Sequence, residues 1–151
     1  MRLLGLDYGA KTVGVAVTDP LLFGVSPLET IFRDRESALR KTCQRIEELV
    51  LEYDPALIVL GNPLNMNGTV GERAEKVLAF KEMLERRLSV PVVLMDERLT
   101  TREAAGRQME AGIPFSERKK NLDAIAAAVI LEDYLENHRN QLKEKEQQKG
   151  T

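Results

Sequence analysis

LLGLDYGAKTVGVAVTD, residues 3–19, contains two apolar runs that are separated by a short turn around Gly9. The first run, residues 3–6, has no polar residue, which is typical of a strand that is covered on both faces. Two such runs across a tight connection predict a β-hairpin. Asp7 would then end a central strand, close to a glycine that lets other groups approach the backbone.

Asp7 itself admits two roles. A carboxylate at the end of a buried strand is costly unless a cation or hydrogen-bond donors meet it. Asp7 either caps the turn through its side-chain oxygens or serves function, as a metal ligand or as a residue that positions a phosphate. This stretch alone leaves both roles open.

The composition is that of one ordinary globular domain. The chain has 151 residues, of which 43% are hydrophobic and 30% charged. It shows no apolar run that could cross a bilayer and no signal-peptide pattern, so we expect a cytoplasmic protein with no membrane association. The single cysteine, Cys43, excludes an internal disulfide and fits a reducing cytoplasm.

Residue counts also limit the chemistry. The chain has one histidine, His138, and one cysteine, which are too few for a typical zinc site and make a Ser-His-Asp triad unfavourable. Catalysis must therefore depend on the 24 acidic residues. The net charge of −2 decides nothing about nucleic acid, because a local basic patch can bind phosphates on a mildly acidic protein.

Beyond the hairpin, strand and helix patterns alternate. Residues 28–32 alternate like a third strand, and Asp34 is the expected N-cap of a helix that ends near Asp54. Residues 56–60 form a short buried strand, so the order predicts a right-handed crossover between parallel strands. The helix carries an apolar stripe on which we expect the cysteine to be buried and unreactive: Leu39, Cys43, Ile46, Val50 and Tyr53.

GNPLNMNGT, residues 61–69, carries no charge and is expected to be a loop that Gly61 opens. Its simpler explanation is turn chemistry, because Asn and Gly tolerate positive φ. The alternative is a phosphate site, since Thr69 and Glu72 fit a capping box and uncharged donors would then lead into a helix N-terminus. Turn chemistry is favoured over the phosphate site.

Residues 90–95 form the next predicted strand, which runs into the charged sequence DER, residues 96–98. A second capping box, Thr100 with Glu103, begins a further helix. Acidic residues therefore follow a strand for the second time, at the edge where open α/β sheets bind ligands. Arg98 either contacts phosphate or pairs with a neighbouring acid at the surface.

The last predicted helix covers residues 121–137. Asp123 shares a helix face with apolar residues: Ala126, Ala127, Ile130 and Tyr134. We therefore expect Asp123 to face the sheet, and the alternative is an acid that only stabilises the helix N-terminus. The domain is expected to cover residues 1–138, followed by a polar, disordered tail over residues 139–151.

Three carboxylates thus follow strand ends or begin a helix: Asp7, Glu97 and Asp123. Brought together without a cation they would repel one another, and a divalent metal removes that repulsion. Oxygen ligands without His or Cys select hard ions such as Mg²⁺ or Mn²⁺. Two such ions about 4 Å apart can activate water and stabilise the leaving oxygen in phosphodiester cleavage.

Four blocks of the sequence, LGLDYGAKTVGVAV, GNPLNMNGT, DERLTT and Asp123-Ala-Ile-Ala-Ala, resemble the YqgF (also RuvX) family of the ribonuclease H-like superfamily. The resemblance extends to about Tyr134. It implies an α/β fold with a central five-stranded mixed sheet, an antiparallel hairpin plus parallel strands, flanked by helices. It also implies that Asp7, Glu97 and Asp123 are the catalytic, metal-binding acids of a nuclease. The implied substrate is the 5′ end of the 16S ribosomal RNA precursor, and an older assignment of the family is resolution of four-way DNA junctions.

Two positions depart from the family pattern: Thr12 replaces a frequent basic residue, and Asn67 replaces the usual Asp. The expected phosphate contacts are therefore Lys11, Arg98 and Arg102. Further candidate substrate contacts are Gly9, Asn62, Asn65, Thr69 and Thr100. Asp96 precedes Glu97 on a strand, so its side chain should point to the other face, where it either supports the site indirectly or is only structural.

Other classes of protein share parts of this pattern. Asp-x-Gly hairpins also occur in actin-like ATPases and sugar kinases, but these need two such domains and 151 residues supply one. A non-catalytic RNA-binding factor would not need three acids. We therefore expect a cytoplasmic, Mg²⁺- or Mn²⁺-dependent nuclease on structured RNA, associated with ribosome assembly. Branched DNA as the substrate, and a monomer or a homodimer as the assembly, stay open.

Overall fold

The hairpin at the start of the chain forms as expected. β1 (Leu3–Tyr8) pairs antiparallel with β2 (Thr12–Thr18), and Asp7 lies opposite Gly14. The computed structural model describes residues 1–64, 71–98 and 122–138. In these residues the hairpin is the centre of a five-stranded sheet with the strand order β3-β2-β1-β4-β5.

The other three strands complete a mixed sheet. β3 (Val25–Phe32) pairs antiparallel with β2 at one edge. β4 (Leu57–Leu64) runs parallel to β1, and β5 (Val92–Arg98) runs parallel to β4. The five-stranded sheet with an antiparallel hairpin and parallel strands is confirmed.

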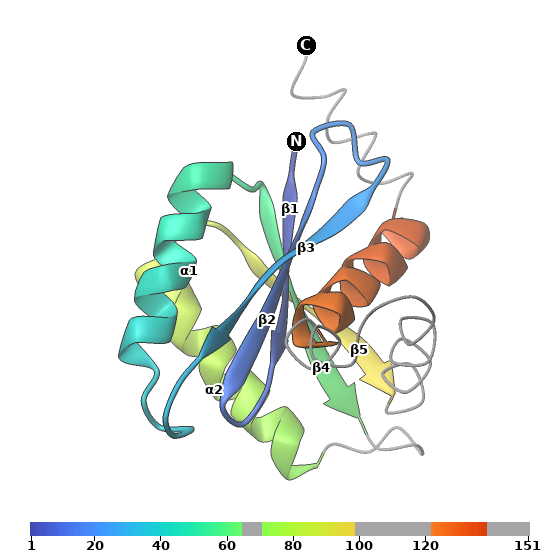
Figure 1. Ribbon diagram of the computed structural model, residues 1–151. Helices are drawn as coiled ribbons and strands as arrows, with labels where there is room; N and C mark the ends of the chain where they lie inside the picture. Colours follow the sequence, from blue (N-terminus) through green and yellow to red (C-terminus); the bar gives the residue numbers. More distant parts are fainter. Residues whose placement is uncertain (65–70, 99–121, 139–151) are drawn as a thin grey trace.

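Helices cover both faces of the sheet (Figure 1). α1 (Arg40–Tyr53) and α2 (Glu72–Arg87) lie on one face, and the helix over residues 122–138, called the C-terminal helix below, crosses the other. Because successive side chains of a strand point to opposite faces, β1 contributes to two cores. Leu4, Leu6 and Tyr8 belong to the core under α1 and α2, whereas Leu3 belongs to the core under the C-terminal helix.

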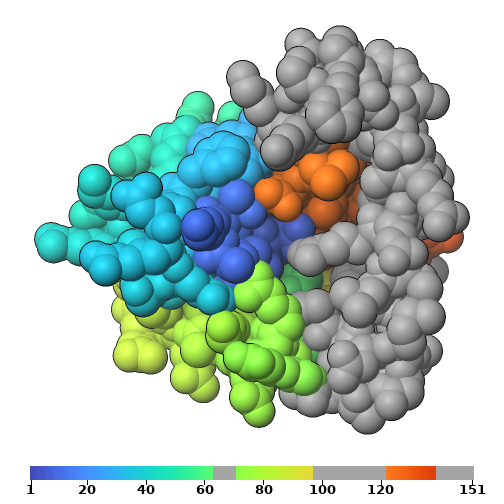
Figure 2. Space-filling view, turned by 60° about the horizontal axis from the view of Figure 1, so that its bottom comes forward, coloured from blue at the N-terminus to red at the C-terminus, as the bar shows by residue number. Residues whose placement is uncertain are grey.

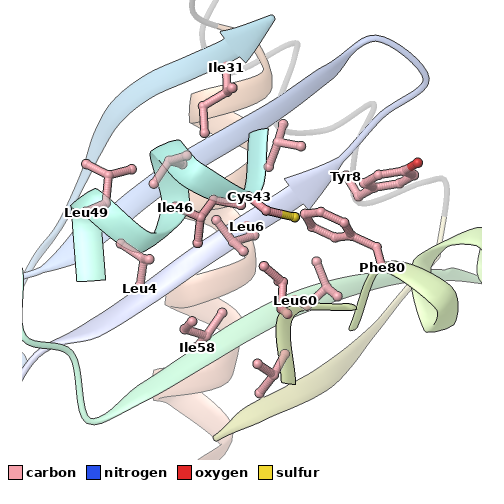
Figure 3. Packing of buried hydrophobic residues seen from close by; sticks show 14 of the residues in the cluster. Leu4, Leu6, Tyr8, Ile31, Cys43, Ile46, Leu49, Ile58, Leu60 and Phe80 are labelled. Carbon is pink, nitrogen blue, oxygen red and sulfur yellow. The ribbon is translucent and has the colours of Figure 1, made fainter. Parts of the chain in front are cut away.

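The core under α1 and α2 confirms the predicted apolar stripe (Figure 3). Cys43 and Ile46 of α1 are fully buried and face Leu6 of the sheet, and Phe80 of α2 contacts Tyr8 with ring centroids 4.7 Å apart. The full burial of Cys43 confirms that its side chain belongs to the core, and burial raises the pKa of the thiol, which disfavours the reactive thiolate.

Glycines of the sheet let the C-terminal helix approach closely. A Cβ added at Gly5 would meet the side chain of Leu131, and one added at Gly61 would meet Ile130. At Gly14 an added Cβ would collide with the carbonyl group of Asp123, which is backbone and cannot rotate away. The C-terminal helix therefore lies in close contact with the sheet.

The expectation that Gly61 opens a loop was wrong. β4 continues through Gly61 to Leu64, in register with residues 95–98 of β5. Pairing with β5 occupies the backbone hydrogen-bonding groups of these residues, which outweighs the turn preference of Asn and Gly. The DER sequence accordingly lies within β5 rather than after it.

Two predicted helix caps were also wrong. The N-cap of α1 is Leu39 rather than Asp34, because residues 34–39 form a turn with its own backbone bonds. The N-cap of α2 is Gly71, so Glu72 is the first helical residue and cannot be the third position of a capping box. Thr69, the helix expected after Thr100 and the tail over residues 139–151 lie outside the described residues.

Among the described residues, no helix combines the length and the apolar character that a membrane span requires.

We predict that Gly14→Ala lowers the free energy of unfolding by about 1–3 kcal/mol, because the new methyl group must displace helix backbone. The measurement is urea denaturation. Gly24→Ala is the control, since a Cβ there would lie 3.4 Å from its nearest neighbour, the Oδ2 atom of Asp19. Equal stability of the two variants would contradict the packing described above.

Candidate active site at the carboxyl end of β1

Asp7 lies at the carboxyl end of the most central strand. Its side chain is buried, with 4% of the residue exposed. Leu3 and Gly5 of β1 face the C-terminal helix, and strand alternation places Asp7 on the same face. A buried, short side chain on a paired strand has little freedom to move, which suits a residue that must hold a fixed position.

Asp123 approaches this end of the sheet from the C-terminal helix. It is half-buried and lies in the first turn of the helix that the structure describes. Its carbonyl group abuts Gly14, which is the hairpin partner of Asp7. The structure thus brings the backbones of Asp7 and Asp123 together on one face, although the two residues are separated by most of the chain.

Glu97 lies near the end of β5, where its backbone pairs with Pro63. The register aligns Leu6, Leu60 and Leu94 across the three parallel strands. Glu97 lies three residues beyond this row on β5, toward the carboxyl end of the strand. The carboxyl ends of the parallel strands β1, β4 and β5 lie at the same end of the sheet, so Glu97 and Asp7 both lie at this end. The side chains of Glu97 and Arg98 lie outside the described residues, as do Asn65, Thr69, Thr100 and Arg102.

The donors at this edge suit a hard cation. Asp7 and Asp123 offer carboxylate oxygens, and neither His nor Cys accompanies them, a choice of ligands that favours Mg²⁺ or Mn²⁺ over zinc. Among the side chains that the structure describes, no three acids, histidines or cysteines gather closely enough to hold a metal. The metal-binding roles of Asp7, Glu97 and Asp123 therefore stay a prediction.

The hairpin turn carries two of the predicted substrate contacts. Lys11 is exposed at the turn. Gly9 has its backbone engaged within the protein: its N–H donates to the Thr12 carbonyl at 2.7 Å, and its carbonyl accepts a hydrogen bond from Arg33. Lys11 is thus free to reach outward, whereas Gly9 shapes the turn.

Asn62 lies on the other face of the sheet from Asp7. Gly61 faces the C-terminal helix, so strand alternation directs Asn62 away from it. Its amide group donates to the Asp96 carboxylate at 3.0 Å. The bond joins two residues on the face away from Asp7, so Asn62 does not lie beside the acids that it was expected to accompany, and the role of Asp96 stays a prediction.

Arg33 was missed by the sequence analysis. It is buried, with 8% exposed, and its guanidinium lies 4.8 Å from the ring centroid of Tyr8. Its backbone N–H also donates to the Lys11 carbonyl at 2.8 Å, so Arg33 holds both sides of the hairpin turn. The charged sequence around Arg33 reads as an exposed turn, and no local pattern signals its burial.

Comparison with known proteins defines the family. A family model described as "RuvX: Holliday junction resolvase" matches residues 1–137. A relative from Agathobacter rectalis, described as "Putative pre-16S rRNA nuclease", is 51% identical over 143 residues, which is 93% of this chain and 100% of the relative. One from Listeria innocua with the same description is 48% identical and covers 90% of this chain and 98% of its own.

Two solved structures share the fold at low sequence identity. Thermus thermophilus RuvC in complex with a Holliday junction substrate matches with a TM-score of 0.53 and 16% identity, over 86% of this chain and 92% of its own. The fowlpox virus Holliday junction resolvase matches with a TM-score of 0.54 and 18% identity, over 91% of this chain and 99% of its own. The mixed sheet with helices on both faces is therefore a ribonuclease H-like fold. Within this class the chain belongs to the RuvX family, as its sequence blocks indicated.

Asp123→Asn separates a role in cleavage from a role in folding. The variant keeps the shape of the side chain but is a poor metal ligand, so we predict that cleavage falls to background while the metal-free melting temperature stays level or rises. If Asp123 only stabilises its helix, the variant should remain active and lose about 0.3–1 kcal/mol of stability. Asp133→Asn, farther along the same helix, is the matched control. An active but destabilised Asp123→Asn protein would remove this residue from the site.

Proposed function

We propose that this chain is a metal-dependent nuclease that cleaves phosphodiester bonds at the 5′ end of the 16S ribosomal RNA precursor. The observation that carries the proposal is the approach of Asp123 to Asp7 across Gly14, at the sheet edge that Glu97 also reaches. Membership of the RuvX family, with relatives described as pre-16S rRNA nucleases, supports the substrate.

Different residues of the chain would bind the metal and the substrate. Asp7, Glu97 and Asp123 would hold Mg²⁺ or Mn²⁺, and the bound cation would supply activation of water and neutralisation of charge on the phosphate. The buried end of β1 fixes Asp7, and the packing of the first described turn of the C-terminal helix against Gly14 fixes Asp123. Because these acids are held in place by the fold, little conformational entropy is lost when the site binds its substrate. Lys11 holds a neighbouring phosphate from the exposed turn.

Four-way junction DNA is the second candidate substrate, because the family model is described as a Holliday junction resolvase. Phosphate contacts alone carry no sequence information and do not separate RNA from DNA. Junction resolution by two symmetric cuts would favour a two-fold dimer, whereas trimming of RNA needs one active site. The substrate and the oligomeric state can therefore be tested together.

A place in the cytoplasm, next to assembling ribosomes, fits this function. Cys43 is a free, buried thiol, which agrees with a reducing compartment.

Activity should require Mg²⁺ or Mn²⁺, because oxygen donors select hard cations. The test incubates purified protein with precursor 16S RNA and with a synthetic four-way junction in parallel. Excess EDTA should abolish cleavage, and a zinc-selective chelator should not. Cleavage of the junction alone would favour the resolvase, and binding without cleavage would favour a non-catalytic RNA-binding factor. Full cleavage in EDTA would contradict the metal-dependent mechanism.

Lys11→Ala should weaken binding and flatten its dependence on salt. Each cation that neutralises a phosphate contributes about 0.9 to the slope of log affinity against log salt on a duplex, so the slope should fall by that amount. The measurement is fluorescence anisotropy at several salt concentrations without divalent metal. Lys81→Ala is the control, since Lys81 pairs with Glu85 at 2.7 Å within α2. Equal slopes in the two variants would place the phosphate path elsewhere.

A further inference from the structure

Two cations bind the carboxylate of Glu36 beside the hairpin turn, and a third binds the backbone of the same residue. Arg73 Nη1 lies 2.9 Å from Glu36 Oε1, and Lys76 Nζ lies 3.0 Å from Glu36 Oε2. The Nε atom of Arg33 donates to the carbonyl oxygen of Glu36 at 3.3 Å. These four residues, Arg33, Glu36, Arg73 and Lys76, are called the Glu36 cluster below.

The Glu36 cluster adjoins the carboxyl end of β1. The guanidinium groups of Arg33 and Arg73 lie 4.8 Å and 5.5 Å from the ring centroid of Tyr8, the residue that follows Asp7. Figure 2 shows this end of the molecule: the hairpin, in blue, lies between the segment after β3 (cyan), the start of α2 (light green) and the start of the C-terminal helix (orange). A strand that passes over the hairpin would reach Asp7 on one side and the Glu36 cluster on the other.

The cluster holds more positive than negative charge. Glu36 divides its carboxylate between Arg73 and Lys76, and its hydrogen bond with Lys76 lowers its pKa. The Nη1 atom of Arg33 is buried and has no hydrogen-bond partner among the described residues. Glu72 also reaches the cluster, at 3.9 Å from Lys76, and its side chain is 86% exposed. Such an exposed pair offsets little of the charge.

The start of α2 adds a second attraction for anions. Arg73 and Lys76 lie in the first two turns of this helix. The N-cap residue, Gly71, has no side chain that could bond the first backbone N–H groups. Those N–H groups and the positive end of the helix dipole both favour negative charge, including that of Glu72 and Glu75 in the same first turn.

We propose that the Glu36 cluster is a second binding site for the sugar–phosphate backbone of the nucleic acid substrate. The phosphate takes the place of the Glu36 carboxylate on Arg73 and Lys76, so Glu36 holds the cations in position until the substrate arrives. The inference rests on the proposed nuclease function, because the bound phosphate belongs to the strand that passes Asp7. Phosphate contacts add affinity and orientation without reading sequence.

Lys76→Gln tests the site, with Lys81→Gln as the matched control on the same helix. Binding of labelled precursor 16S RNA and of a labelled four-way junction is measured by fluorescence anisotropy in EDTA, where cleavage is blocked. For Lys76→Gln the salt slope should fall by about 0.9 on duplex or about 0.7 on single strands. Lys81→Gln should keep the wild-type slope. Equal slopes in the two variants would overturn the proposal.

Glu36→Gln should change binding affinity and salt slope in the direction opposite to Lys76→Gln. Removing the competing carboxylate should tighten binding at low salt and steepen the salt slope, because Arg73 and Lys76 are released to the phosphate. If the cluster only holds the fold together, Glu36→Gln should lower the melting temperature without tightening binding, and that result would overturn the proposal.

The cleavage assay with Mg²⁺ keeps the two proposals apart. Cleavage by the wild type together with an unchanged slope in Lys76→Gln overturns the binding site and leaves the nuclease function. A reduced slope in Lys76→Gln without cleavage by the wild type overturns the nuclease function and supports the binding site.

Discussion

The packing of the C-terminal helix directly against β2 is the contact on which the candidate site depends. Gly14 has no side chain, and the carbonyl group of Asp123 occupies the space that a Cβ would need. Gly14 is also the partner of Asp7 in the hairpin, so one contact both closes the core under this helix and sets two acids at one end of the sheet. The stability of that core and the geometry of the acids are therefore coupled.

The alternation of β1 gives consecutive residues different surroundings. Asp7 lies on the face of the C-terminal helix, whereas Tyr8 packs against Phe80 on the other face and lies under the Arg33 guanidinium. The proposed cleavage site and the Glu36 cluster thus share one rigid support, the buried end of β1. A substrate strand held on both sides of the hairpin would be fixed in position and direction before cleavage. The substrate would then lose its translational and rotational entropy during binding rather than in the cleavage step.

Much of the fold was predictable because it depends on local periodicity. The hairpin follows from two apolar runs across a glycine turn, and the burial of Cys43 follows from its place on a helical stripe. Boundaries failed where long-range contacts outweighed local preference. Pairing with β5 extends β4 past Gly61, and the contacts of Arg33 and Glu36 hold a turn where Asp34 would have capped a helix.

The sequence by itself determined the fold class and the family, because these depend on residue types and their order along the chain. It did not determine which residues meet. The approach of Asp123 to Asp7 depends on the missing side chain at Gly14, and the direction of Asn62 depends on the register of β4 with β5. The burial of Arg33 against Tyr8 depends on where β3 ends beside the hairpin turn. Each of these is a contact between segments distant in sequence, so only the tertiary structure decided it.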